Sequence, residues 1–227
     1  MLNLPRILYK SSVKIAYKLG LYYTRMERYV EKFKDYITRD STLLDLGCGR
    51  GDFSRVLVGR ARRVISLDID LDVLRIFPSN PRILKVCADA QHLPVRPNSI
   101  DVVLAISLLE HVGDPSSVIN EVYECLKPSG FFIVQLPNPQ WFIEPHTKFP
   151  LLFILPSTLK EAIREQLKYD CINFRLTLKR LEELTRNYFL TIKRVPLYHR
   201  LKTPPWPPAW LIMLQKTSRY SAGLKPR

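Results

Sequence analysis

The sequence of 227 residues is 46% hydrophobic and carries a formal net charge of +14 at pH 7. Its apolar content is enough to bury one substantial core, which argues against a disordered chain and favours one decorated domain. The four cysteines lie 38 to 46 residues apart, which excludes a zinc knuckle or a CxxC redox motif, and we expect them to be reduced and mostly buried.

Helical periodicity marks the first part of the chain. Apolar side chains recur mostly at steps of three or four residues, at Ile15, Leu19, Tyr22, Met26, Tyr29, Phe33 and Ile37. This pattern predicts one or two amphipathic helices within residues 1–40. Lys and Pro interrupt the start of this segment, so it lacks the continuous apolar stretch of a secretory signal, and no later run approaches the roughly 20 apolar residues of a membrane span. We expect a cytoplasmic protein whose only membrane contact is peripheral.

Short β-rich runs then alternate with helical stretches, which is typical of βαβ units and a parallel sheet. We predict strands at 43–47, 63–68, 82–87, 100–106 and 131–136, with helices near 51–60, 71–77 and 115–126. Asp114 followed by Pro115 predicts an N-cap with proline at the first helical position.

Beyond the fifth strand the pattern loosens. Four prolines within residues 138–156 predict an irregular segment on the substrate side. Helices are predicted at 157–168 and 178–188, and the last strands at 190–195 and 210–215. The expected organisation is 1–40 for the basic amphipathic helices, 41–137 for the binding core, 138–188 for the substrate-side insertion and helices, and 189–227 for the strands that complete the sheet.

A glycine-rich turn follows the first predicted strand. The run Asp45 to Gly51 reads DLGCGRG, which brings three glycines to a place where backbone must approach a ligand closely. Its GxGxG spacing differs from the GxGxxG of loops that bind a pyrophosphate. Asp45 suits a ligand that carries an ammonium group.

The segment LLDLGCGRGDF, residues 43–53, resembles motif I of class I S-adenosylmethionine-dependent methyltransferases, and the similarity extends through about residues 40–137. This resemblance implies an α/β fold: a doubly wound, mostly parallel, seven-stranded Rossmann-like methyltransferase sheet with N-terminal helices and an insertion after strand 5. It also implies S-adenosylmethionine as cofactor and S-adenosylhomocysteine as product. The loop residues expected to contact the cofactor are Asp45, Gly47, Cys48, Gly49 and Gly51.

The resemblance carries further residues of the cofactor site. An acidic residue at the end of the second strand binds both ribose hydroxyls in this family, which assigns Asp68, with Ile69 beside it; Asp70 is expected to cap the next helix. The acidic residue after the third strand accepts from the adenine amino group, which assigns Asp89 and its neighbour Ala90. The passage ADAQHLPVRPNSIDVV resembles the branch that contains quinone-biosynthesis and many small-molecule methyltransferases.

The acceptor side is less determined. Ser107 and Leu108 are expected to line the cofactor. His111 is expected to face the substrate and is a candidate general base, although Glu110 and His111 alternatively only fix their loop by hydrogen bonds. In the insertion, Trp141, Glu144 and Phe149 are candidate substrate contacts, and His146 is a candidate general base or a packing residue. No set of His, Cys and carboxylates has metal-ligand spacing, and the GxSxG of a serine hydrolase is absent.

The excess positive charge is confined to the two ends of the chain. Residues 1–40 carry nine basic and four acidic side chains, residues 41–138 ten and eleven, and residues 139–227 sixteen and six. Basic flanks attract phosphate, nucleic acid or an anionic membrane, or they are simply solvated. We therefore predict methyl transfer to a small-molecule or lipid-like acceptor, with the N-terminal helices, including Tyr22, Met26 and Tyr29, in peripheral membrane contact. RNA methylation and a non-catalytic binding or scaffold role are the alternatives, and the oligomeric state stays open.

Overall fold

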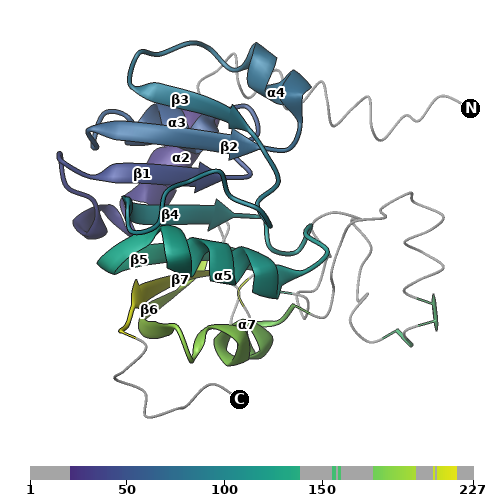
Figure 1. The fold of residues 1–227 in the computed structure, drawn as a ribbon. Helices are drawn as coiled ribbons and strands as arrows, with labels where there is room; N and C mark the ends of the chain where they lie inside the picture. The colour runs from purple at the N-terminus through teal and green to yellow at the C-terminus, as the bar shows by residue number, and fades with distance from the viewer. Residues whose placement is uncertain are drawn as a thin grey trace, which may run out of the picture.

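The computed structural model describes residues 21–138, 155–156, 158–159, 176–197, 207 and 209–218. Its centre is a seven-stranded sheet of order β3-β2-β1-β4-β5-β7-β6 (Figure 1). The strands are β1 Thr42–Leu46, β2 Arg63–Asp68, β3 Ile83–Cys87, β4 Ile100–Ile106, β5 Leu126–Pro137, β6 Phe189–Leu197 and β7 Ala209–Lys216. The first five pair in parallel, whereas β7 is antiparallel to both β5 and β6. The predicted doubly wound, mostly parallel sheet is confirmed.

Helices cover both faces of this sheet (Figure 1). One face carries α5 Pro115–Cys125 and α7 Leu178–Thr185, and the other carries α2 Leu21–Val30, α3 Asp52–Leu57 and α4 Leu71–Ile76. A short 3-10 helix, η1, spans Lys34–Tyr36. Both predicted caps are confirmed, because Asp114 accepts from the backbone N–H of Ser116 and Asp70 accepts from those of Asp72 and Val73.

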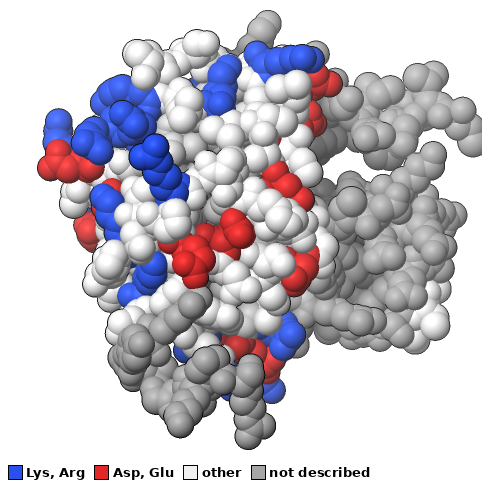
Figure 2. All heavy atoms as spheres, in the orientation of Figure 1, with Lys and Arg blue, Asp and Glu red and all other residues white. Residues whose placement is uncertain are grey.

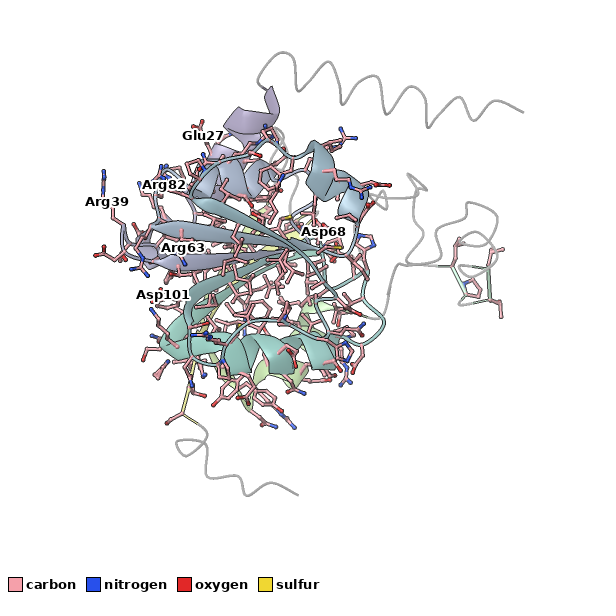
Figure 3. The ribbon with its side chains drawn as sticks, turned by 45° about the horizontal axis from the view of Figure 1, so that its top comes forward. Glu27, Arg39, Arg63, Asp68, Arg82 and Asp101 are labelled. Carbon is pink, nitrogen blue, oxygen red and sulfur yellow. The ribbon has the colours of Figure 1, made fainter. Side chains whose placement is uncertain are left out.

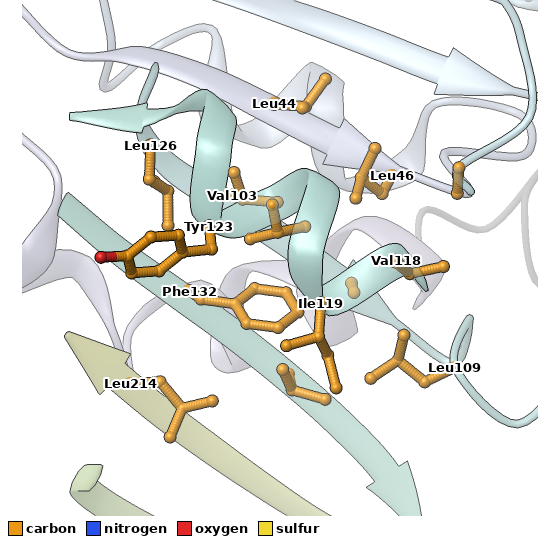
Figure 4. Packing of buried hydrophobic residues seen from close by; sticks show 14 of the residues in the cluster. Leu44, Leu46, Val103, Leu109, Val118, Ile119, Tyr123, Leu126, Phe132 and Leu214 are labelled. Carbon is orange, nitrogen blue, oxygen red and sulfur yellow. The ribbon is translucent and has the colours of Figure 1, made fainter. Parts of the chain in front are cut away.

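The larger core lies between α5 and the sheet, as Figure 4 shows. α5 packs against this sheet through Val118, Ile119 and Tyr123. Beneath them lie the fully buried strand residues Val103 and Phe132. Burying one such side chain contributes about 1.5–3 kcal/mol. This packing holds the parallel strands in register, so that β1, β2, β3 and β4 present their carboxyl ends along one edge.

The amphipathic face of α2 packs against the other side of the sheet. Met26 and Val30 of α2 are buried, as is Phe33 just after the helix, and the ring of Tyr29 meets that of Phe53 edge-on, with 6.0 Å between centroids. Met26 therefore faces the core and not a membrane, whereas Tyr29 is only partly buried, and residues 1–20 of the helices predicted to contact a membrane lie outside the described residues. The side chain of Tyr22 lies outside the described part. Among the described residues, no helix is both long and apolar enough to cross a bilayer.

Helix lengths differ from the prediction in two places. The helix predicted at 51–60 ends at Leu57, where Val58 still has helical dihedrals but Gly59 follows. The helix predicted at 178–188 ends at Thr185, whose hydroxyl donates back to the Leu181 carbonyl. The helix predicted at 157–168 lies almost entirely outside the described residues.

Candidate functional site

The loop between β1 and α3 is built on three left-handed glycines. Gly47, Gly49 and Gly51 have φ values of 66°, 52° and 74°. The backbone N–H groups of Gly47 and Cys48 both donate to the Leu67 carbonyl, at 2.8 and 3.0 Å. The loop therefore continues the β1–β2 pairing for one step beyond the strand and then turns sharply into α3.

The three glycines have different surroundings. A Cβ built on Gly47 would lie 2.8 Å from Cδ1 of Leu108, and one built on Gly51 would collide with the ring of Phe77. Around Gly49, by contrast, nothing lies within 4 Å of such a Cβ. Packing against the protein explains the outer two glycines, whereas the middle one borders open space where a ligand can approach its backbone.

Asp68, the last residue of β2, holds this loop by its side chain. Its Oδ2 accepts from the backbone N–H of Gly49 at 2.7 Å, and its Oδ1 accepts from that of Asp70 at 3.0 Å. Figure 3 places Asp68 at the carboxyl end of the sheet. The next side chain, Ile69, is 70% exposed, which is unusual for a large apolar residue at the end of a central strand.

Asp45 lies beneath the loop and is only 2% exposed. Its Oδ2 accepts from the hydroxyl of Ser54 at 2.5 Å, and Ser54 and Ser66 share a hydrogen bond of 2.7 Å. Burial raises the pKa of the Asp45 carboxyl group to about 7, although the Ser54 bond opposes that rise. The carboxyl group is therefore poised between its neutral and ionised forms near neutral pH.

The Cys48 thiol of the loop is not suited to act as a nucleophile. Burial raises the pKa of the Cys48 thiol, so its thiolate is negligible at neutral pH. Cys48 and Cys125 are buried and free, as expected. Cys87, at the end of β3, is free but exposed, because β3 is an edge strand. Cys171 lies outside the described residues.

Asp89 and Ala90 follow the neighbouring strand β3. The side chain of Asp89 is 37% exposed and accepts from the backbone N–H of Gln91 at 2.9 Å. The side-chain amide of Gln91 donates to Asp89 and accepts from the Asp114 backbone N–H at 3.0 Å. Ala90 is buried in the core. Gln91 thus ties the β3 loop to the start of α5.

The turn after β4 carries the remaining described candidates. Ser107 has a φ of 52°, and its hydroxyl donates to Oε1 of Gln135 at 2.5 Å. Leu108 packs its side chain against Gly47. The His111 backbone N–H donates to the Leu108 carbonyl at 2.8 Å, and its Nε2 lies 4.0 Å from Oε1 of Glu110, which is 2% exposed. His111 itself reaches the surface of this edge.

The structure brings most predicted site residues to one edge of the sheet. Direct hydrogen bonds or packing join Gly47, Gly49, Asp68 and Leu108 around the loop. The predicted substrate contacts and second base all lie outside the described residues, namely Trp141, Glu144, His146 and Phe149.

Sequence reasoning missed three supporting residues. The ring of Phe77 packs against Gly51. The Ser54 hydroxyl donates a hydrogen bond to Asp45, and the Gln135 side chain accepts one from Ser107. Gln135 left a visible signal, since it is the single polar residue in the otherwise apolar run FFIVQL. Phe77 and Ser54 left none, because their partners are distant in sequence or common in type.

Charge is unevenly distributed over the two ends of the parallel strands. Eight acidic residues of the core lie at or after the carboxyl ends of β1 to β4: Asp45, Asp52, Asp68, Asp70, Asp72, Asp89, Glu110 and Asp114. Two of them are paired with arginines, Asp52 with Arg55 and Asp72 with Arg75. At the opposite end, Lys and Arg gather where β1, β2 and β3 begin, on the left in Figure 2. The candidate site therefore favours a cationic ligand. Within the described ranges, no group of three or more His, Cys, Asp or Glu is arranged to hold a metal ion.

Comparisons with known proteins agree with this geometry. A family model described as a methyltransferase domain matches residues 44–134. A probable S-adenosylmethionine-dependent methyltransferase of Mycolicibacterium smegmatis is 34% identical over 97 residues, which are 42% of this chain and 38% of the relative. A ubiquinone biosynthesis O-methyltransferase of Pseudomonas entomophila is 32% identical over 111 residues, covering 44% and 47%. The chain thus spans less than half the length of either relative.

Solved structures show the same fold. The crystal structure of a putative S-adenosylmethionine-dependent methyltransferase from Listeria monocytogenes superposes with a TM-score of 0.64 at 19% identity, and it covers 83% of this chain and 98% of its own. At that identity the likeness is one of fold, and it includes the sheet whose carboxyl edge forms the candidate site.

Proposed function

The chain belongs to the class I S-adenosylmethionine-dependent methyltransferase family, and on that premise we propose that it transfers the methyl group of this cofactor to a small-molecule or lipid-like acceptor by direct in-line displacement. One observation carries the proposal. In the glycine loop, Gly49 borders open space while its backbone N–H donates to Asp68, and the buried Asp45 precedes the loop. When bound, the cofactor supplies a methyl group already activated by a sulfonium. The chain then has only to bind, orient and exclude water.

Asp68 retains the capacity to bind two ribose hydroxyls. An ionised carboxylate offers about four lone-pair sites, and Asp68 uses two of them on backbone N–H groups of Gly49 and Asp70. The remaining two sites are free to accept from a pair of adjacent hydroxyls. The same side chain would then fix the loop and the ligand together.

Ile69 and Asp89 suit an adenine ring. The exposed Ile69 side chain offers an apolar surface on which a flat ring can pack, and contact there would remove that surface from water. The partly exposed Asp89 carboxylate, on the adjacent loop, can accept from an exocyclic amino group.

Asp45 suits the positively charged amino-acid end of the cofactor. Its burial disfavours the charged carboxylate, and a nearby cation would reverse that preference. The acidic character of the whole edge acts in the same direction, since the cofactor carries a sulfonium and an ammonium against a single carboxylate. Asp45 would thus bind the ligand most tightly in its ionised form.

His111 is the described candidate for removing a proton from a hydroxyl acceptor. It lies on the turn after β4, three residues from Leu108, which packs against Gly47 of the glycine loop, and its ring is partly exposed. Glu110 next to it is suited to orienting the ring. An amine or an acidic carbon would need no such base. Trp141, Glu144, His146 and Phe149 stay predicted acceptor contacts.

The small or lipid-like acceptor is supported by the similarity to a ubiquinone biosynthesis O-methyltransferase over 44% of this chain and by the acidic edge, which repels a polyanion at the point of transfer. RNA is the second candidate acceptor, favoured by the strongly basic segments 1–40 and 139–227.

A labelled-methyl assay separates these candidates. The chain is incubated with S-adenosylmethionine carrying a tritiated methyl group and a cell extract, which is then divided into organic-soluble, RNA and protein fractions. We expect label in the organic-soluble fraction and none with Gly49→Val. Label confined to RNA would overturn the small-molecule acceptor. Cofactor binding without transfer to any fraction would support the scaffold alternative instead.

A further inference from the structure

We propose that the amino ends of β1, β2 and β3 form a docking surface for the phosphate backbone of RNA, at the opposite end of the sheet from the cofactor edge. Three neighbouring loops build it, residues 38–41, 58–63 and 77–82. Four arginines define this arginine surface: Arg39, Arg62, Arg63 and Arg82. All four are exposed. Within the described part of the chain, none of them has an acidic partner.

The strand register brings these arginines together. β1 and β2 pair Thr42 with Arg63, and the Arg62 backbone N–H donates to the Ser41 carbonyl at 3.0 Å. On the other side of β2, the Val64 N–H donates to the Arg82 carbonyl at 2.9 Å. Figure 3 shows Arg39, Arg63 and Arg82 at one end of the molecule. Three adjacent strands span about 10 Å, which matches about three nucleotides at a rise of 3.4 Å each.

The neighbouring acidic groups leave this charge uncompensated. The three loops hold five arginines and a single acidic residue, Asp40. The fifth arginine, Arg60, is paired with Glu31 and is not part of the surface. Asp101, on the next strand, accepts from the Thr42 N–H and is bonded to Lys127, both at 2.8 Å. Net positive charge therefore remains at the four defining residues.

The chemistry of the surface favours RNA over a membrane or a protein partner. A guanidinium is planar and binds phosphate oxygens through two parallel N–H groups. Membrane insertion and protein interfaces both need apolar anchors. Within the described ranges, none of the exposed large apolar side chains lies in these three loops. A backbone-tracking polyanion needs no such anchor.

This surface is remote from the reacting atoms. Asp68 lies at the far end of β2 from Arg63, and six residues of strand span roughly 20 Å. RNA held there would anchor the protein without entering the cofactor edge. The docking role is therefore separate from the identity of the methyl acceptor.

Charge reversal in the full chain tests this surface. Binding of a fluorescein-labelled single-stranded RNA of about 20 nucleotides is followed by anisotropy at several salt concentrations. The double variant Arg62→Glu/Arg82→Glu is compared with Lys179→Glu/Arg186→Glu, which makes the same charge change at exposed residues of α7 and its end. We expect about tenfold or greater loss of affinity for the first, with a salt slope smaller by about 1 to 2, and under about twofold loss for the second. Titration with S-adenosylhomocysteine verifies that both variants keep their folded core.

Several outcomes would overturn the docking surface. Equal losses in the two variants would show that net charge alone attracts RNA. Absence of RNA binding by the unaltered chain would remove the partner. If the chain bound phosphatidylserine vesicles or polyglutamate in preference to RNA, and the Arg62→Glu/Arg82→Glu variant lost that binding, the arginine surface would be reassigned to a membrane or an acidic protein.

Discussion

Replacement of Asp68 by asparagine separates cofactor binding from loop support. The substitution keeps the size of the side chain and one carbonyl acceptor, but it removes the negative charge and turns one acceptor into a donor. Asp68 bonds the backbone of Gly49 and Asp70, so the loop loses one of two charge-assisted bonds. The proposed ribose site loses at least one more.

The expected magnitude follows from these bonds. A hydrogen bond to a charged group contributes about 1.5–3 kcal/mol, and asparagine recovers part of it. We expect S-adenosylhomocysteine to bind the Asp68→Asn variant more weakly by about 1 to 3 kcal/mol, which is about 5- to 150-fold in Kd. The free energy of unfolding should fall by about 1 kcal/mol through the Gly49 bond.

Asp101→Asn is the matched control. Asp101 also accepts from a backbone N–H, that of Thr42 at 2.8 Å, but it lies at the opposite end of the sheet (Figure 3). Calorimetric titration and urea denaturation are applied to both variants. Both should lose some stability, and only Asp68→Asn should lose affinity. Unchanged affinity in a folded Asp68→Asn variant, or equal losses in the two variants, would refute the ribose assignment.

Three further predictions concern the loop and the buried carboxyl group. Gly49→Val should abolish binding of S-adenosylhomocysteine while Cys48→Ala changes its Kd by less than about threefold, because only Gly49 borders open space; normal binding by a folded valine variant would contradict this. Gly51→Ala should lower the free energy of unfolding by about 2 kcal/mol more than Gly49→Ala in urea titrations, because its methyl group meets Phe77; equal costs would contradict the packing. Burial raises the pKa of Asp45 to about 7, so the fold favours the neutral carboxyl group. This preference stabilises the cofactor-free fold fully below pH 4, and the contribution is lost as the pH rises through 7. Cofactor affinity should change in the opposite direction and increase between pH 6 and 8, since a cation binds the ionised carboxylate; titrations that are equally pH-dependent in Asp45→Asn would exclude this cause.

The sheet and its caps were predictable because their signals are local. Alternating apolar runs and helical stretches have the periodicities that parallel sheets impose. Asp70 and Asp114 accept from backbone N–H groups only two or three residues away, so a short stretch of sequence is enough to predict that they cap helices. The glycine pattern also located the loop, and its neighbour Asp68 came from the family resemblance.

The surface against which α2 packs was not predictable from such local signals. An amphipathic stripe with Met26 and Tyr29 is equally suited to a bilayer surface and to the face of a sheet. Whether α2 meets a bilayer or the sheet depends on long-range packing against Phe53 and the strands, which the periodicity of the sequence does not reveal.

The individual roles of the glycines required three-dimensional neighbours. In the sequence Gly47, Gly49 and Gly51 are equivalent members of one motif. Leu108 and Phe77, which lie 61 and 26 residues away from Gly47 and Gly51, assign two of them to packing and leave only Gly49 for a ligand. Contacts across such separations are made by tertiary structure, so no local pattern reveals them.

Calorimetric titration of the full chain with S-adenosylmethionine, beside Gly49→Val, tests the central claim most directly. We predict saturable one-to-one binding by the unaltered chain and none by the folded valine variant. A folded chain that fails to bind S-adenosylmethionine, or a valine variant that binds it with unchanged affinity, would contradict the assignment of the cofactor site.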